Sequence, residues 1–187
     1  MIISIDLSLR STGIVALQEH KLIDFAVISS ANGNSKSIHP VHNNESLLVY
    51  NAEQVCAFIQ KQNENYALDG IVIEGLSFGG LSGAKDIIQG NFWNIRCELY
   101  KKFIGVPIGI CPVTSWRSKT LNKAERAEAL AKYGKKLYLK QGVYDKLPDY
   151  VKERFVDYVK LNKLKKDSLF DLSDAYFLGI FRMNMEE

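Results

Sequence analysis

The start of the chain contains three apolar runs separated by short polar turns, and this arrangement constrains the fold more than any other feature. The run IISID ends on Asp6, GIVALQ begins at Gly13, and LIDFAVIS begins at Leu22. Short runs rich in β-branched residues are typical of strands, and short connections between them are typical of an antiparallel meander. The chain is therefore predicted to begin with a three-stranded meander.

Helical and strand patterns alternate after a polar stretch over residues 30–44. Helical spacing of apolar residues spans about 45–63, LDGIVIEG follows as a fourth strand, a second helix is predicted over about 83–104, and VPIGICPV is a fifth strand. This order predicts an α/β fold in a single domain spanning 1–187. Its mixed sheet would place the first strand between the meander and the later parallel strands.

The second predicted helix is apolar on two faces. One face would cover the sheet. The other carries Trp93, Cys97, Tyr100 and Ile104, and two explanations of this surplus are open: a dimer interface, or a helix buried on both sides.

Positive charge is concentrated late in the chain. Residues 117–166 contain 15 Lys and Arg but 6 Asp and Glu, whereas the net charge of the whole chain is +3. Segments 114–137 and 147–166 are predicted to be basic helices separated by YLKQGVYDK, and Asp167 or Ser168 would cap a last helix. The basic region indicates either a polyanionic partner or an ordinary solvated helical surface.

Four acids are predicted to meet at one edge of the sheet. Asp6 and Glu74 end two strands that would be parallel neighbours, and the carboxyl ends of such strands share the edge where open α/β sheets bind ligands. Asp171 and Asp174 lie on one side of a helix turn that can pack over this edge. Taken singly, Asp6 is equally well explained as a turn residue and Asp171 as a helix cap.

Clustered carboxylates repel one another unless a cation lies among them, and hard oxygen ligands favour Mg²⁺ or Mn²⁺. A pair of such ions activates a water molecule and stabilises the leaving oxygen in phosphodiester hydrolysis. The four acids therefore indicate a metal-dependent phosphodiesterase.

Three segments carry a family resemblance: IISIDLSLRSTGIVAL, the long stretch from DGIVIEGLSFGG to TLNK, and DLSDAYFLGI. In order and spacing they resemble the three acidic motifs of the RuvC group of Holliday-junction resolvases, in the ribonuclease H-like superfamily. The middle segment is the most specific, because a strand, Glu-Gly, a loop, a long helix, a GVP strand and Thr-x-x-basic follow one another as in that family. The resemblance is loosest over 125–165, as in a phage or otherwise divergent member.

The resemblance implies a five-stranded sheet with helices on both faces and Mg²⁺-dependent cleavage of branched DNA, with Mn²⁺ as a substitute. It also implies a homodimer that cuts two strands symmetrically and leaves 5′-phosphate and 3′-hydroxyl ends. By position, Asp6, Glu74, Asp171 and Asp174 match the metal-binding acids: Asp6 would anchor both metals, Glu74 and Asp174 would complete the ligand sets, and Asp171 would bind one metal or orient the water.

The resemblance and the local sequence together suggest a set of DNA-binding residues. Phe78 lies in a glycine-rich loop and could stack on unpaired bases at a branch point, or pack back onto the sheet. The family places an aromatic residue three positions after the glutamate, where this chain has Ser77. Basic residues that flank the acids or match family positions near the scissile phosphates complete the set: Arg10, Lys85, Arg117, Lys119 and Lys123.

Two alternatives to a junction resolvase are open. Because of the shifted aromatic, the enzyme could instead prefer flaps or forks. From another class, IDLSLRSTG resembles the first phosphate loop of actin-like sugar kinases, but those ATP-binding phosphotransferases are much longer and need a second lobe. No nucleotide cofactor is expected. The chain has no apolar stretch of membrane-spanning length and no signal-peptide pattern, which predicts a cytoplasmic protein without a membrane partner.

Overall fold

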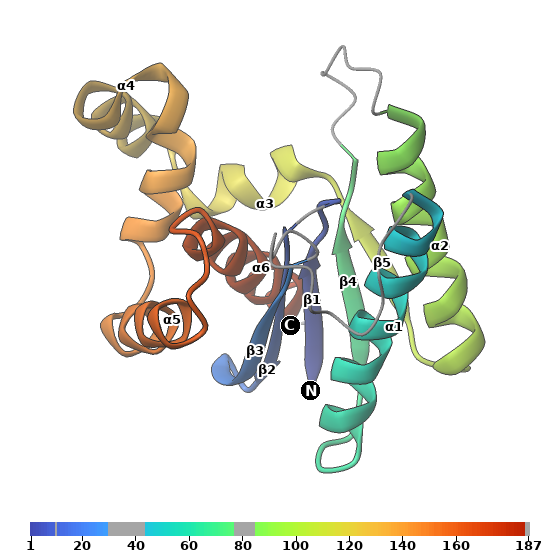
Figure 1. Cartoon of the computed structure of the whole chain (residues 1–187). Coiled ribbons are helices and arrows are strands. Elements are labelled where there is room, and N and C mark those ends of the chain that lie inside the picture. The colour runs from blue at the N-terminus through green and yellow to red at the C-terminus, as the bar shows by residue number, and fades with distance from the viewer. Residues whose placement is uncertain (10, 30–43, 77–84, 186–187) are drawn as a thin grey trace.

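The structure is a computed structural model that describes residues 1–9, 11–29, 44–76 and 85–185. One mixed five-stranded sheet lies at its centre (Figure 1). The strand order is β3-β2-β1-β4-β5. The strands are β1 (Ile2–Asp6), β2 (Ser11–Gln18), β3 (Lys21–Ser29), β4 (Gly70–Glu74) and β5 (Ile108–Cys111).

The predicted meander and its continuation are confirmed. β1 pairs antiparallel with β2 and parallel with β4, which in turn pairs parallel with β5. The central strand β1 thus joins the antiparallel half of the sheet to the parallel half.

Helices cover both faces of the sheet (Figure 1). Side chains alternate along β1, so that Ile3 and Ile5 face one core while Ile2 faces the other. The first face is covered by α1 (Asn44–Asn63) and α2 (Lys85–Lys102). The second is covered by α3 (Val113–Thr120), α4 (Lys123–Asp145), α5 (Asp149–Leu161) and α6 (Ser168–Met183).

The last helix, α6, packs closely on the sheet, and small residues allow this approach. A Cβ atom at Gly179 would lie 2.8 Å from the Ser4 hydroxyl oxygen, and a Cβ at Gly13 would lie 2.3 Å from the carbonyl oxygen of Asp171. Ser4 itself is fully buried. These two close contacts therefore set the distance between α6 and the strands β1 and β2 at both ends of the helix.

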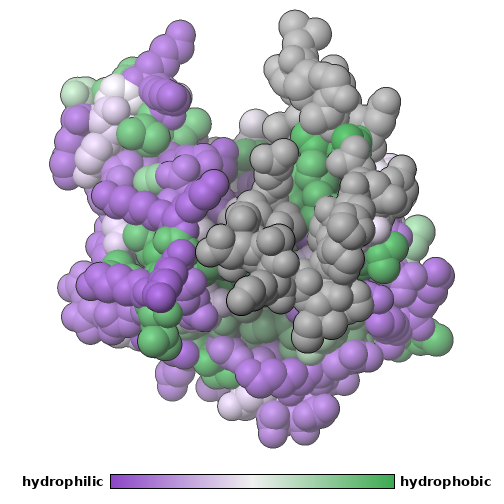
Figure 2. All heavy atoms as spheres, viewed as in Figure 1, coloured by the Kyte–Doolittle hydropathy of each residue, from purple (hydrophilic) through white to green (hydrophobic). Residues whose placement is uncertain are grey.

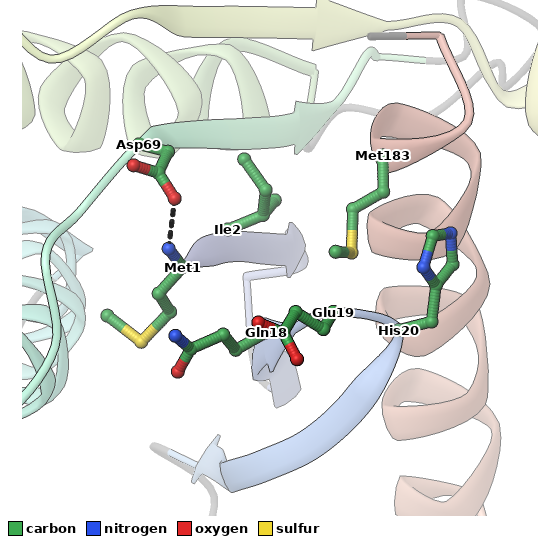
Figure 3. A pocket seen from close by; sticks show the side chains of 7 residues that line it. All are labelled: Met1, Ile2, Gln18, Glu19, His20, Asp69 and Met183. Atoms are coloured by element: carbon green, nitrogen blue, oxygen red, sulfur yellow. Dashed lines mark hydrogen bonds and ion pairs between the residues drawn. The ribbon is translucent and has the colours of Figure 1, made fainter. Parts of the chain in front are cut away.

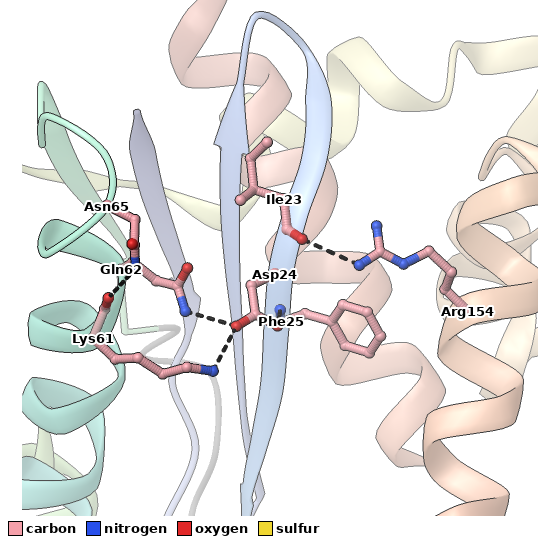
Figure 4. Close-up of polar contacts among 7 residues, drawn as sticks. All are labelled: Ile23, Asp24, Phe25, Lys61, Gln62, Asn65 and Arg154. Carbon is pink, nitrogen blue, oxygen red and sulfur yellow. Dashed lines mark hydrogen bonds and ion pairs between the residues drawn. The ribbon is translucent and has the colours of Figure 1, made fainter.

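The edge strand β3 is held from both sides by side chains of neighbouring helices (Figure 4). On one side, the Asp24 carboxylate accepts hydrogen bonds from Lys61 at 3.1 Å and Gln62 at 2.6 Å, both in α1. On the other, Arg154 of α5 donates to the carbonyl oxygens of Leu22 at 2.9 Å and Ile23 at 3.1 Å.

The basic helices differ from the prediction in two places. The stretch 114–137 is divided at Leu121 and Asn122, where Asn122 and Glu125 form a capping box. The segment YLKQGVYDK, predicted to separate two helices, belongs almost wholly to α4, and the helical dihedral angles break earlier, at Gly134, where φ is 71°. The start of α6 agrees with the prediction, although the Asp167 side chain makes no capping hydrogen bond.

The second apolar face of α2 is exposed rather than buried on both sides. Trp93 is 56% exposed, Tyr100 52% and Ile104 87%. Cys97, on the same face, is also exposed, whereas Cys56 and Cys111 are buried. No helix among the described residues combines the length and the hydropathy that a bilayer span requires.

Candidate active site

Asp6 and Glu74 end neighbouring strands. The parallel register of β1 and β4 places Ile5 beside Ile73, so the next residue of each strand carries its carboxylate to the same edge of the sheet. Both side chains are half-buried, and they are hydrogen-bonded to each other. The structure therefore brings these two predicted residues together.

Asp171 and Asp174 come to this edge on the first two turns of α6. They are three residues apart and lie on the same side of the helix. The Ser11 hydroxyl, at the start of β2, donates a hydrogen bond to Asp171 at 2.5 Å and fixes this side chain over the sheet. Asp174 is buried, with 3% of its surface exposed.

The other three acids lie close enough to Asp6 to interact with it electrostatically. Burial raises the pKa of Asp6 well above its ordinary value, and the negative charges of Glu74, Asp174 and Asp171 raise it further. The three neighbouring acids therefore make it harder for Asp6 to ionise. A cluster of this kind favours binding of a cation.

Burial has the same effect on the two acids of α6. It raises the pKa of Asp174 to about 7, although the positive charges of Arg117 and Lys140 oppose the shift. Burial also raises the pKa of Asp171, against the hydrogen bond from Ser11 and the charge of Lys140.

The short helix α3 adds two side chains to the acids, because it begins directly after β5, the neighbour of β4. Trp116 is fully buried, and its indole N–H donates a hydrogen bond of 3.0 Å to Glu74 Oε1. The next residue, Arg117, forms an ion pair with Asp174 through Nη2, and the same atom lies 3.9 Å from Glu74 Oε1.

Arg117 thus lies among the acids. Burial disfavours its charge, but the negative charges of Asp174, Glu74 and Asp6 raise the pKa of Arg117 above its usual value. Two buried atoms of the ion pair lack a hydrogen-bond partner within the described part of the chain, Arg117 Nε and Asp174 Oδ1.

The acids suit a divalent cation by their chemistry, since carboxylate oxygens are the preferred ligands of Mg²⁺. The unpartnered Asp174 Oδ1 is a free oxygen ligand of this kind. With Arg117 in its present position, no three His, Cys, Asp or Glu side chains of residues 1–9, 11–29, 44–76 and 85–185 are arranged to hold a metal ion.

Of the other predicted DNA-binding residues, two are exposed and four cannot be placed. Lys119 in α3 and Lys123 at the start of α4 are exposed. Arg10, Ser77 and Phe78 lie outside the described residues, as does the side chain of Lys85, whose backbone begins α2.

Sequence reasoning missed Lys140. This α4 residue is exposed, its ammonium lies 5.9 Å from the centre of the Phe170 ring, and its charge acts on both Asp171 and Asp174. Its segment was predicted to be a non-helical separator, so no helical face could be assigned to it. Ser11 was also missed, although its place in the polar turn after Asp6 is a usable signal.

Hydrophilic side chains gather over α4 and α5, as Figure 2 shows. Exposed lysines of this surface include Lys132, Lys135, Lys136, Lys160 and Lys163. The basic segment predicted from the charge count therefore presents its charges to solvent.

A cavity of about 490 Å³ lies at the opposite end of β1, away from the acids (Figure 3). The start of β1, the turn between β2 and β3, Asp69 and Met183 line it. Because Asp6 and Glu74 lie at the other ends of their strands, this cavity is separate from the acidic cluster.

Comparison with solved structures gives matches over nearly the whole chain. Thermus thermophilus RuvC matches with a TM-score of 0.53 and 13% identity, over 99% of this chain and 96% of that one. T. thermophilus RuvC in complex with Holliday junction substrate matches with a TM-score of 0.52 and 12% identity, over 98% and 94%. The yeast mitochondrial Holliday junction resolvase Ydc2 matches with a TM-score of 0.55 and 14% identity, over 97% of this chain and 77% of that one.

No family model and no curated protein matches the sequence. The structural matches confirm the predicted fold: a five-stranded mixed sheet with helices on both faces, similar to the folds of RuvC and Ydc2.

Proposed function

We propose that the chain is a Mg²⁺-dependent endodeoxyribonuclease that cuts branched DNA, with the four-way Holliday junction as its preferred substrate. The observation that carries this proposal is the convergence of Asp6, Glu74, Asp171 and Asp174, from β1, β4 and α6, on a fold shared with RuvC and Ydc2. In this proposal residues 1–187 act as one nuclease domain.

Asp6, Glu74 and Asp174 are the residues that would hold Mg²⁺, with Mn²⁺ as a substitute, and Asp171 would complete the site or orient the attacking water. When bound, the cations activate this water and stabilise the leaving oxygen. The residues around the acids fix their orientation: Ser11 holds Asp171 at 2.5 Å and Trp116 holds Glu74 at 3.0 Å. Such supporting hydrogen bonds restrict ligand geometry and tune ligand basicity.

The basic segment would bind the phosphate backbone around the cut. Arg117 lies beside the acids, and Lys119 and Lys123 are exposed nearby in the sequence. The exposed lysines of α4 and α5 would add sequence-independent binding, which weakens steeply as salt increases. Arg10, Ser77, Phe78 and Lys85 remain predicted DNA contacts.

A homodimer is part of the proposal, because a four-way junction must be cut in two strands related by symmetry, and a two-fold dimer supplies two matching sites. The apolar side chains that α2 and the following turn leave exposed, Trp93, Tyr100 and Ile104, offer surface for this contact. One solved structure of matching fold is that of RuvC with Holliday junction substrate.

A flap- or fork-selective endonuclease is the second candidate. It is favoured by one sequence observation, the presence of Ser77 where the family typically carries an aromatic, with Phe78 displaced by one residue. Both candidates use the same acids and differ only in substrate.

The test compares a mobile four-way junction, a 5′ flap and a linear duplex, each with Mg²⁺ and with Ca²⁺. We expect cutting of the junction with Mg²⁺, and binding without cutting with Ca²⁺. Asp6→Asn should slow the cutting ~1000-fold or more while binding persists, because the cation site loses a charge. Glu64→Gln, which neutralises an exposed acid after α1, is the control and should cut normally.

Unchanged cutting by the Asp6→Asn protein would contradict the nuclease assignment as a whole. Faster cutting of the flap than of the junction would contradict the resolvase assignment and support the second candidate.

A further inference from the structure

We propose that Arg117 is a displaceable counter-charge, which neutralises Glu74 and Asp174 when no divalent cation is bound and turns to a DNA phosphate when a cation replaces it. This inference rests on the proposed function, because it assumes that the acids bind Mg²⁺. In this inference Arg117 competes with the metal ion for the acids, whereas a residue that only contacts a phosphate would not.

The contacts of Arg117 place its guanidinium where a cation would be needed. Its Nη2 pairs with Asp174 Oδ2 and lies 3.9 Å from Glu74 Oε1, so one positive group lies between acids from α6 and β4. Since Glu74 and Asp174 both act on the Arg117 charge, a divalent cation held by the same two acids would compete with the guanidinium directly.

The ion pair is incompletely satisfied. Arg117 Nε and Asp174 Oδ1 are buried, and neither has a hydrogen-bond partner among the residues that the structure describes. A buried polar atom without a partner typically costs ~1 to 3 kcal/mol. A cation on Asp174 and a phosphate on Arg117 would supply both missing partners, so the bound state satisfies groups that the metal-free state leaves unpaired.

The surroundings allow Arg117 to turn without disturbing α3. Its guanidinium carbon lies 4.9 Å from the centre of the Trp116 ring, which offers a flat surface along which it can move. The Arg117 side chain is 21% exposed, so solvent already reaches it. Trp116 is fully buried and bound to Glu74, so α3 keeps its position during the exchange.

The test measures Mn²⁺ binding to the full chain without DNA, by calorimetry and by the electron paramagnetic resonance signal of free Mn²⁺. We expect Arg117→Gln to bind Mn²⁺ about 10-fold more tightly than the unaltered protein, because the competing charge is gone. Metal-free Arg117→Gln should melt at a lower temperature, because the acids lose their counter-charge, and Mn²⁺ should raise its melting temperature more than that of the unaltered protein.

Two further variants complete the experiment. Arg154→Gln makes the same chemical change in α5. Arg154 donates hydrogen bonds to the carbonyl oxygens of Leu22 and Ile23 in β3, at the end of the sheet opposite the acids. Its Mn²⁺ affinity should be unchanged. Arg117→Lys keeps the charge but replaces the forked guanidinium with a single ammonium, so its affinity should be intermediate. It is also the variant to use if Arg117→Gln does not fold.

The outcomes separate this inference from the proposed function. Equal or weaker Mn²⁺ binding by the Arg117 variants, with clear binding by the unaltered protein, would overturn the inference and leave the nuclease proposal intact. Absence of Mn²⁺ binding in every variant would overturn the metal-dependent function itself and the inference with it.

Discussion

The backbone of Asp171 lies directly over Gly13: a Cβ atom at Gly13 would come within 2.3 Å of the Asp171 carbonyl oxygen. Gly13 pairs with Asp6 across β1 and β2, so the first acid of the chain and the last helix meet at one glycine. The absence of a side chain at this position sets the height of α6 above the sheet, and with it the distance between Asp6 and the acids of α6.

Gly13→Ala should therefore affect both stability and the site. We expect a loss of ~1 to 3 kcal/mol in the free energy of unfolding, as for other overpacked positions, measured by urea denaturation. Cutting should fall further than stability alone explains, because Asp171 and Asp174 are displaced. Gly109→Ala in β5 is the control, since its Cβ would meet the nearest atom, the Ile71 carbonyl oxygen, at 3.9 Å. An equal effect of both substitutions would contradict this account.

Trp116→Phe should weaken Mn²⁺ binding at the acids without leaving a large cavity in the core. Phenylalanine fills much of the same space but cannot donate the 3.0 Å hydrogen bond to Glu74. Hydrogen bonds to charged groups contribute ~1.5 to 3 kcal/mol, so we expect a loss of this order in unfolding free energy and weaker Mn²⁺ binding by calorimetry. Trp93→Phe, on the exposed face of α2, is the matched control for the Mn²⁺ affinity, which it should leave unchanged. A loss of stability with unaltered Mn²⁺ affinity would show that Trp116 only fills space.

The metal-free protein should lose stability as the pH rises through about 7, because burial raises the pKa of Asp174 to about 7. The folded chain therefore keeps a proton that the unfolded chain releases at lower pH. The stabilising contribution is complete below the ordinary Asp pKa and disappears above about 7, with an upper limit of ~4 kcal/mol. Burial raises the pKa of Asp6 as well, which acts in the same direction.

This pH dependence is measured as the melting temperature in the presence of a chelator between about pH 5 and about pH 8.5, roughly the range over which Asp174 titrates. Asp174→Asn should flatten the curve, and saturating Mg²⁺ should remove most of the loss at high pH, since the cation replaces the proton. A curve for the unaltered protein that is parallel to that of Asp174→Asn would show that Asp174 does not titrate in this range.

Lys140→Gln should reduce DNA binding near the acids. The Lys140 charge acts on Asp171 and Asp174, so a phosphate bound between them and α4 would lie within its reach. We expect junction binding in Ca²⁺ to weaken, and the slope of log affinity against log salt to fall by about 1. Lys21→Gln, exposed at the start of β3 and at the end of the sheet opposite the acids, is the control. Equal losses would indicate a general charge effect.

The sheet and two pairs of acids could be predicted because they follow from local patterns. Asp6 and Glu74 each end an apolar run, and parallel neighbouring strands bring their ends together. Asp171 and Asp174 share a helix face through their spacing alone. Their meeting with Asp6 depends on the docking of α6, which the small residue at position 13 permits.

The pairing of Arg117 with Asp174 could not be predicted in the same way. Arg117 was expected to face DNA phosphates, and only the packing of Trp116 beneath the end of β4 turns α3 so that Arg117 reaches the acids. The segment YLKQGVYDK was predicted to separate two helices, but its Gly142 is a packing position inside α4, where a Cβ would lie 3.2 Å from Ala129, and the helical dihedral angles break at Gly134 instead.

The acids come from opposite ends of the chain, since Asp6 ends β1 while Asp171 and Asp174 belong to α6, the last helix. The chain must therefore be synthesised at least as far as Asp174 before the four acids can come together. Any product released early, or shortened by proteolysis before α6, lacks half of the acids. Under the proposed function, such shortened products would lack nuclease activity.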